Sequence, residues 1–135
     1  MSITAEQAVE VFRAADCLHD ETAVGRALDR LAGEIRSVLT GKEAVALVVM
    51  NGGLMPAAGL LLRLDLPLRI DYLHATRYRE RTSGGLLDWQ RHPEVSLAGC
   101  DVLVIDDILD EGLALAAIVD DCRAAGARRV WSAVL

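Results

Sequence analysis

The stretch Val102–Leu115, which reads Val-Leu-Val-Ile-Asp-Asp-Ile-Leu-Asp-Glu-Gly-Leu-Ala-Leu, decides the fold of this 135-residue chain. It opens with four apolar residues, as in a parallel strand that is covered on both faces. Asp106 and Asp107 follow where that strand emerges, and ligands of open α/β sheets bind at this carboxyl end. Gly112 permits a positive φ, and the apolar series after it predicts a helix that begins at the loop. The stretch therefore predicts an anion site at a sheet edge, because the first N–H groups of that helix face the loop.

A second apolar run, Ala44–Met50, leads directly into Asn51, Gly52 and Gly53. Two successive glycines let backbone amides approach an anion closely. The apolar run Leu54–Leu64 predicts a helix that starts at this loop. The arrangement of strand, loop and helix is thus predicted twice.

A third segment reads Tyr-Leu-His-Ala-Thr-Arg-Tyr-Arg over residues 72–79, and it predicts the end of a strand. The polar residues 80–85 follow, with few apolar anchors and two adjacent glycines. Such a composition favours a mobile loop, since little apolar surface holds it in place.

In their order along the chain, the three stretches resemble the type I phosphoribosyltransferases, in particular the hypoxanthine-guanine enzymes of purine salvage. The amino-acid sequence of the third stretch is similar to that of proteobacterial members. The resemblance covers residues 44–135, about two-thirds of the chain. It implies an α/β fold, a three-layer core with a mostly parallel sheet flanked by helices. It also implies transfer of the 5-phosphoribosyl group from phosphoribosyl pyrophosphate (PRPP) to hypoxanthine or guanine, giving IMP or GMP and pyrophosphate, with Mg²⁺ as cofactor.

The resemblance assigns binding roles to the loops. Asp106 and Asp107 would hold the ribose hydroxyls of PRPP. The pyrophosphate loop would be formed by Asn51, Gly52 and Gly53, after a cis peptide between Met50 and Asn51. The 5′-phosphate loop would comprise Asp110, Glu111, Gly112, Leu113, Ala114 and Leu115. Both features also have an interpretation without a ligand: Asp106 and Asp107 could belong to a solvated loop, and Gly52 and Gly53 could form an ordinary turn.

Three residues receive catalytic roles by the same resemblance. Asp110 would act as general base, or accept a hydrogen bond from the purine. Arg77 and Tyr78 stand where the family has a Ser-Tyr pair, at the start of a loop that closes over PRPP and excludes water. The alternatives are a helix N-cap for Asp110 and plain surface for Arg77 and Tyr78.

The sequence departs from the family in two places. Glu111 and Ala114 occupy positions where the family usually carries hydroxyl residues. A lost hydrogen bond to a charged group costs about 1.5–3 kcal/mol, so PRPP would bind about ten- to a hundredfold more weakly. The second departure follows the strand expected at 129–135: the lysine, aromatic residue and acid of the base-binding hood do not occur, so we expect the hood to be truncated or absent.

Two alternative functions follow. A catalytically weak or inactive relative that senses PRPP or nucleotides would explain Ala114 and the missing hood. A phosphoacceptor receiver domain also places acids at strand ends. Its acid pair belongs near the first strand, whereas this pair comes late, after a Gly-Gly loop, which disfavours that alternative.

Composition indicates one compact domain over residues 1–135, since 53% of the residues are hydrophobic and only 4% are aromatic. The net charge of −6 disfavours nucleic acid as a partner, and a chain of this charge needs Mg²⁺ and local amides to hold phosphates. The cysteines, Cys17, Cys100 and Cys122, lack metal-ligand spacing and suggest a reducing cytoplasm. We expect no leader peptide and no membrane span.

The first 41 residues predict two helices that pack on the core, ahead of the PRPP-binding core at 44–135. Thr4 and Gln7 form a capping-box pattern before an apolar stripe that includes Val9 and Phe12. Asp20 can cap a second helix that ends near Gly41. The resemblance further implies a homodimer or homotetramer.

Overall fold

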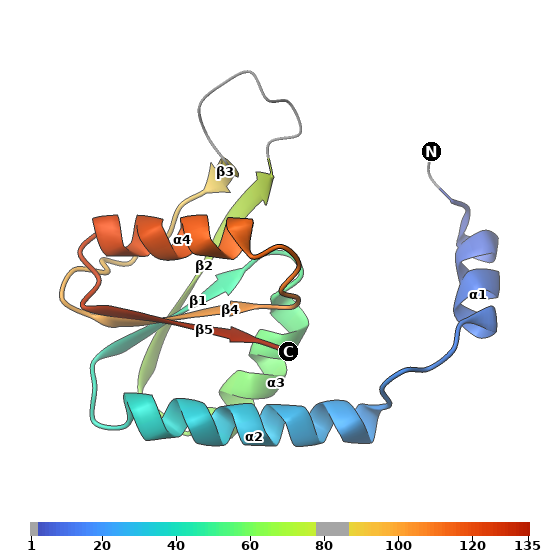
Figure 1. Ribbon diagram of the computed structural model, residues 1–135, viewed down its shortest axis with the longest axis horizontal. Helices are drawn as coiled ribbons and strands as arrows, with labels where there is room; N and C mark the ends of the chain where they lie inside the picture. The colour runs from blue at the N-terminus through green and yellow to red at the C-terminus, as the bar shows by residue number, and fades with distance from the viewer. Residues whose placement is uncertain (1–2, 78–86) are drawn as a thin grey trace.

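The computed structural model describes residues 3–77 and 87–135. Five strands form one sheet in the order β3-β2-β1-β4-β5 (Figure 1). The strands are β1 Ala44–Val49, β2 Leu68–Arg77, β3 Leu87–Arg91, β4 Asp101–Asp106 and β5 Arg129–Val134. The helices are α1 Ala5–Ala14, α2 Glu21–Leu39, α3 Leu54–Leu64 and α4 Leu113–Ala124. The α/β fold class predicted from the sequence is confirmed.

The sheet is parallel except at one edge. β1 pairs in parallel with β2 and β4, and β4 pairs in parallel with β5, whereas β3 runs antiparallel to β2. All six residues of β1 and the first five of β4 are buried, which agrees with their continuous apolar sequences. β3 was not predicted, because it is short and its half-buried residues alternate with exposed polar ones.

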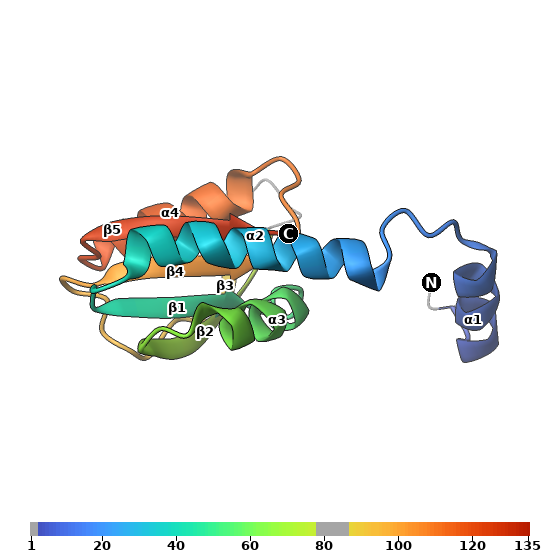
Figure 2. The ribbon, with the colours of Figure 1, turned by 90° about the horizontal axis from the view of Figure 1, so that it is seen from below.

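Helices cover both faces of the sheet and complete three layers (Figures 1 and 2). α2 and α3 pack on one face, where Leu39, Leu60 and Leu103 are almost fully buried. α4 packs on the other face through Ile118 and Cys122. α2 and α3 approach closely at Gly59, since a Cβ there would lie 2.7 Å from a methyl of Leu28. The central strands are therefore shielded from solvent on both sides.

The two N-terminal helices differ in their surroundings. α2 buries Leu28, Ala32, Ile35 and Leu39, all on one side of the helix. α1 has no buried residue, and it lies beyond the N-terminal end of α2, away from the sheet (Figures 1 and 2). Both helices carry the predicted caps, since the side chains of Thr4 and Asp20 accept hydrogen bonds from backbone N–H groups. α1 is thus a formed helix without a packing partner in the described chain.

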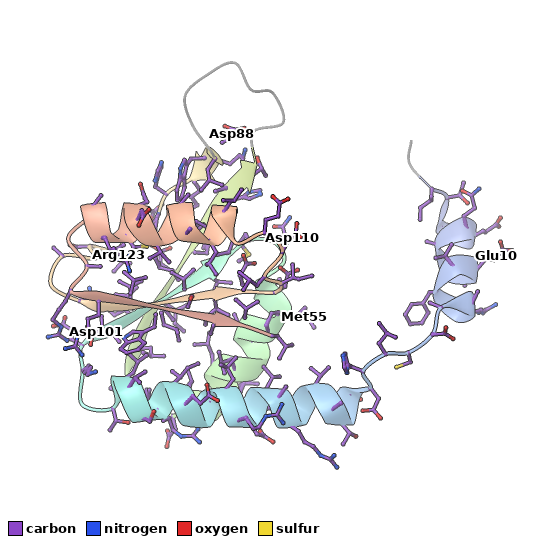
Figure 3. The ribbon with its side chains drawn as sticks, in the orientation of Figure 1. Glu10, Met55, Asp88, Asp101, Asp110 and Arg123 are labelled. Carbon is purple, nitrogen blue, oxygen red and sulfur yellow. The ribbon has the colours of Figure 1, made fainter. Side chains whose placement is uncertain are left out.

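The amino edge of the sheet holds one buried carboxylate. Asp101 is fully buried and accepts a hydrogen bond of 3.0 Å from Arg128 Nε. Lys42 Nζ lies 3.9 Å from its other oxygen. The hydrogen bond from Arg128 lowers the pKa of Asp101, so the carboxylate stays charged. This end of β4 is opposite to the end that leads into the loop containing Asp110 (Figure 3).

Candidate active site

The loops after β1 and β4 meet at the carboxyl edge of the sheet, because the two strands are adjacent and parallel. A Cβ on Gly52 would lie 2.5 Å from an Asp107 carboxylate oxygen. The side chain of Asp107 therefore rests directly on the backbone of Gly52, and any side chain at position 52 would have to displace it. The two loops, predicted separately as sites for pyrophosphate and ribose, form one continuous surface.

Gly53 fixes the first loop to the sheet. Its N–H donates to the carbonyl of Val49 at 2.8 Å, and a Cβ would lie 2.6 Å from the carbonyl oxygens of Val49 and Ile105. α3 then begins at Leu54, with Gly53 as its N-cap. The peptide between Met50 and Asn51 is cis, as the resemblance implied. Asn51 and Gly52 are exposed beside the end of β4, whereas Gly53 is buried under it.

The acid pair lies at the end of β4. Asp106 is half-buried and Asp107 is exposed, and the Asp107 N–H donates to Asp106 Oδ1 at 2.9 Å. Burial raises the pKa of Asp106, and the neighbouring Asp107 carboxylate raises it further. Among residues 3–77 and 87–135, no cationic side chain contributes to this shift. The pair is thus suited to accept hydrogen bonds from hydroxyls or to bind a cation.

A cavity of about 350 Å³ opens beyond the acid pair. Its floor is the start of α4, where Gly112 has a φ of 77° and offers no side-chain cap. The first N–H groups of a helix lack partners within the helix and favour an anion. The residues that line the cavity are Asp106, Asp107, Ile108, Leu109, Asp110, Gly112, Ala114 and Leu115. The size and the exposed helix start suit a phosphate with an attached sugar.

The structure brings together most of the predicted 5′-phosphate loop. Asp110, Gly112, Ala114 and Leu115 line the cavity, whereas Glu111 and Leu113 are exposed and lie outside that lining. Glu111 is thus outside the cavity lining, and its charge does not contribute to the cavity wall. Ala114 does face it, in the first turn of α4, so the missing hydroxyl is at the cavity wall.

The catalytic positions predicted on the third stretch are only partly described. Arg77 is the last residue of β2, where its backbone is opposite Leu87 of β3. Tyr78 and the predicted loop at 80–85 lie outside the described residues. Their roles stay predictions.

Two residues of the cavity were not predicted from the sequence. Ile108 and Leu109 line it although 68% and 58% of their surfaces are exposed. The signal in the sequence was a pair of large apolar residues between acids, in a loop where polar residues are the norm. They give the mouth of the cavity an apolar surface beside the carboxylates.

Metal binding can be tested against the donor set. Among the described residues, no three His, Cys, Asp or Glu side chains gather around a possible ion. Mg²⁺ often binds through one or two carboxylates together with oxygens of its substrate and water. Asp106 and Asp107 meet that requirement, so the site fits a magnesium ion shared with a phosphate-containing ligand.

The fold and the site together define an α/β protein with an acid-lined pocket at the carboxyl edge of its mostly parallel sheet. Residues 14–135 match the phosphoribosyl transferase domain family, and the chain belongs to this family. Of the helices within residues 3–77 and 87–135, none combines the length and apolar composition that a membrane crossing requires.

Known relatives agree with this assignment. The chain is 29% identical to the hypoxanthine-guanine-xanthine phosphoribosyltransferase of Tritrichomonas foetus, over 73% of this chain and 54% of that protein. It is also 29% identical to the hypoxanthine-guanine phosphoribosyltransferase of Bacillus subtilis, over 76% of this chain and 58% of that protein. The chain therefore spans little more than half the length of these relatives.

Solved structures show the same fold. A hypoxanthine phosphoribosyltransferase from Staphylococcus aureus superposes with a TM-score of 0.85, at 23% identity, over 94% of this chain and 70% of that one. A hypoxanthine-guanine phosphoribosyltransferase from Bacillus anthracis gives a TM-score of 0.83 at 26% identity, over 90% and 72% of the two chains. The predicted resemblance to purine-salvage phosphoribosyltransferases is confirmed.

Proposed function

We propose that the protein transfers the 5-phosphoribosyl group of PRPP to hypoxanthine or guanine, producing IMP or GMP and pyrophosphate. One observation carries this proposal most strongly: Asp107 lies on Gly52, which joins the acid pair and the glycine loop into one site. PRPP needs such continuity, because its ribose connects the pyrophosphate to the 5′-phosphate. The names of the Bacillus subtilis and Tritrichomonas foetus relatives support the choice of a 6-oxopurine.

Each part of the site has a task in this reaction. Backbone amides of Asn51 and Gly52 bind the pyrophosphate, in the loop that the Gly53 N–H anchors to Val49, and those at the start of α4 bind the 5′-phosphate. Asp106 and Asp107 accept hydrogen bonds from the ribose hydroxyls. The bond from the anomeric carbon to pyrophosphate breaks as the purine nitrogen attacks that carbon. The two carboxylates then lie near a sugar that gains positive charge, which electrostatically favours the transition state.

The cofactor we propose is Mg²⁺, held by Asp106 and Asp107 together with oxygens of PRPP. When bound, it would neutralise charge on the departing pyrophosphate. Asp110 is the proposed general base, since it lines the cavity next to the acid pair. Arg77 and Tyr78 are proposed to begin the loop that closes over PRPP and keeps water away.

Several further assignments belong to the same proposal. The chain works as a single phosphoribosyltransferase-like domain over residues 1–135. It acts in the cytoplasm, where two of its three free cysteines, Cys100 and Cys122, stay buried. Neither nucleic acid nor a membrane is a partner, and the protein assembles as a homodimer or homotetramer.

The direct test is incubation with PRPP, Mg²⁺ and a mixture of hypoxanthine, guanine, xanthine, adenine and uracil, followed by mass spectrometry of any nucleotide. IMP or GMP would support the proposal and identify the preferred base. A nucleotide formed only from adenine or uracil would contradict the assigned substrate class.

A second candidate function is a regulator that binds PRPP or nucleotides without turnover. Ala114 favours it, because this residue faces the cavity and offers no hydroxyl to a phosphate. Calorimetric titration with PRPP distinguishes the two functions. Binding without a nucleotide product would identify the regulator, and the absence of both would exclude the two together.

A further inference from the structure

α1 is a well-formed helix with an apolar face that no described part of the chain buries. Its capping box, built from Thr4 and Gln7, is complete. Val9 and Phe12 lie on one side of the helix, and 47% and 83% of their surfaces are exposed. Most helices gain stability by burying an amphipathic face, and a ten-residue helix in isolation is marginal in water. The sequence of α1 therefore indicates a partner surface.

A matching surface occurs on the first half of α2. A cavity of about 580 Å³ lies there, beside Leu135, which follows β5. Ala23, Val24 and Ala27 give it an apolar floor, and Arg26 and Arg30 border it. The first turns of α2 extend beyond the end of β5, so this surface is open to an approaching helix (Figure 1).

The charges of the two surfaces are complementary. α1 carries Glu6 and Glu10, which are four residues apart, and α2 carries Arg26 and Arg30 with the same spacing. An antiparallel pairing that sets Glu10 opposite Arg26 also sets Glu6 opposite Arg30. The two glutamates and two arginines form no ion pair within the described part of the chain.

The apolar residues fit the same register. With Glu10 opposite Arg26, Val9 comes opposite Ala27 and Phe12 comes opposite Val24. Phe12 is large and the two alanines of the cavity are small, so the helix faces have complementary shapes. Antiparallel packing also places the helix dipoles favourably.

The chain holds α1 away from its own α2. The connecting residues 15–20 begin and end in extended backbone, with ψ of 142° at Ala15 and 171° at Asp20. α1 projects past the N-terminal end of α2 in both views (Figures 1 and 2). A helix held out on an extended arm is placed to reach a neighbouring molecule, as in domain-swapped dimers.

We propose that the occupant of the α2 cavity is α1 of a second copy of this chain. Two copies exchange their α1 helices reciprocally about a two-fold axis, each helix packing antiparallel on the first half of the partner's α2. The exchange covers Val9 and Phe12 and forms the pairs Glu6–Arg30 and Glu10–Arg26 across the interface. This goes beyond the proposed transferase function, because none of these residues belongs to the candidate active site.

The test is a pair of charge reversals in the full chain. The variant Glu6→Lys/Glu10→Lys should be monomeric by light scattering, and so should Arg26→Glu/Arg30→Glu, whereas the unmodified protein is dimeric. An equimolar mixture of the two variants should recover the dimer, because both interfaces of the heterodimer are then complementary. The control Asp88→Lys/Asp120→Lys makes the same change in net charge as Glu6→Lys/Glu10→Lys, at exposed positions on β3 and α4 away from both helix surfaces, and should stay dimeric.

Three outcomes would overturn the proposal. They are a monomeric unmodified protein, variants that stay dimeric, and a mixture that stays monomeric. A cross-link separates exchange from folding back: Val9→Cys/Ala27→Cys, in a chain with Cys17→Ser, should give a covalent dimer on oxidation. A covalent monomer would show that α1 docks on its own α2 and would refute the exchange.

Discussion

The two ends of β4 carry carboxylates with opposite surroundings. At the amino end, Asp101 is fully buried and held by Arg128 and Lys42, and its pKa is lowered. At the carboxyl end, burial raises the pKa of Asp106, and the carboxylate of the adjacent Asp107 raises it further. Asp101 is thus paired with cations of the protein, whereas the pair Asp106 and Asp107 has no cationic partner among the described residues.

This difference has a physical basis in the sheet. Both ends of a parallel strand reach a loop, but only the carboxyl end faces the starts of helices, where a bound anion such as a phosphate is favoured. Two adjacent carboxylates at this edge repel each other, which lowers the stability of the fold unless a ligand or cation binds them. A carboxylate without a cationic partner at such an edge is therefore a better marker of function than one within an ion pair.

The largest expected effect comes from the acid pair. In the variant Asp106→Asn/Asp107→Asn, the ribose hydroxyls lose charged hydrogen-bond acceptors and the metal loses its carboxylate ligands. We therefore expect kcat/KM for PRPP to fall about a thousandfold, which corresponds to roughly 4 kcal/mol of transition-state stabilisation. The midpoint of thermal unfolding should stay the same or rise, because two repelling charges are removed. A nucleotide-formation assay and a thermal melt measure the two quantities.

The control for this pair is Asp120→Asn/Asp121→Asn, which neutralises two adjacent acids on α4. Those acids lie near Arg123 and His92, away from the cavity. Their neutralisation should leave kcat/KM within about twofold. Equal losses in both double variants would show that net charge, and not the pair, matters.

The glycine loop gives the next effect, on stability. Gly53→Ala places a Cβ 2.6 Å from two backbone carbonyl oxygens, which cannot move without shifting β1 or β4. We expect about 3 kcal/mol of destabilisation in urea unfolding. Gly52→Ala instead meets the side chain of Asp107, which can rotate away.

Gly52→Ala should therefore cost less than about 1 kcal/mol of stability, yet weaken PRPP binding. The Gly53 substitution thus reports on folding stability, and the Gly52 substitution reports on ligand binding. Equal destabilisation by both substitutions would contradict the contact that we describe between Gly52 and Asp107.

Asp101→Asn tests the amino end of β4. The substitution leaves Arg128 without its charged acceptor and puts an amide next to Lys42, so we expect a loss of about 2 kcal/mol. Nucleotide formation below the unfolding temperature should be unchanged, because Asp101 is at the far end of the strand. A loss of activity in the folded variant would break the distinction between the two ends.

Much of this architecture could be predicted from the sequence. The buried strands Ala44–Val49 and Asp101–Asp106 follow from continuous apolar runs, which only a sheet covered on both faces accommodates. The caps Thr4 and Asp20 are local patterns with a local outcome. Position at a strand end was enough to predict the loops that meet at Gly52.

Other features depend on contacts between distant segments, which spacing does not encode. β3 is short, and it is part of the sheet only through its pairing with β2. Which residues of the 110–115 loop face the cavity depends on where α4 starts its first turn, so Glu111 and Leu113 could not be separated from Ala114 in advance. The apolar stripe of α1 predicts a packing helix, but the stripe does not say on which molecule it packs.

Asp71, on β2, is a third kind of carboxylate, one held by several hydrogen bonds, and the effect of replacing it depends on pH. Burial alone would raise its pKa, but donors from Val95 N–H, Tyr72 N–H, Arg91 and Glu94 N–H outweigh it and lower the pKa from 3.8 to about 2. These bonds tie the segment after β3 to β2. Asp71 resembles Asp101 in accepting a hydrogen bond from an arginine of the protein.

Because the pKa of Asp71 is lower in the folded state, the unfolded chain binds the proton first as the pH falls. The stabilisation is complete above the unfolded value of 3.8 and disappears as the pH falls towards about 2. We expect Asp71→Asn to lose about 2 kcal/mol at neutral pH, and to match the unmodified protein in the most acidic samples. Urea unfolding across this pH range measures the difference. A constant gap between the two proteins would mean that Asp71 stabilises the segment after β3 through packing, and that its charge contributes nothing.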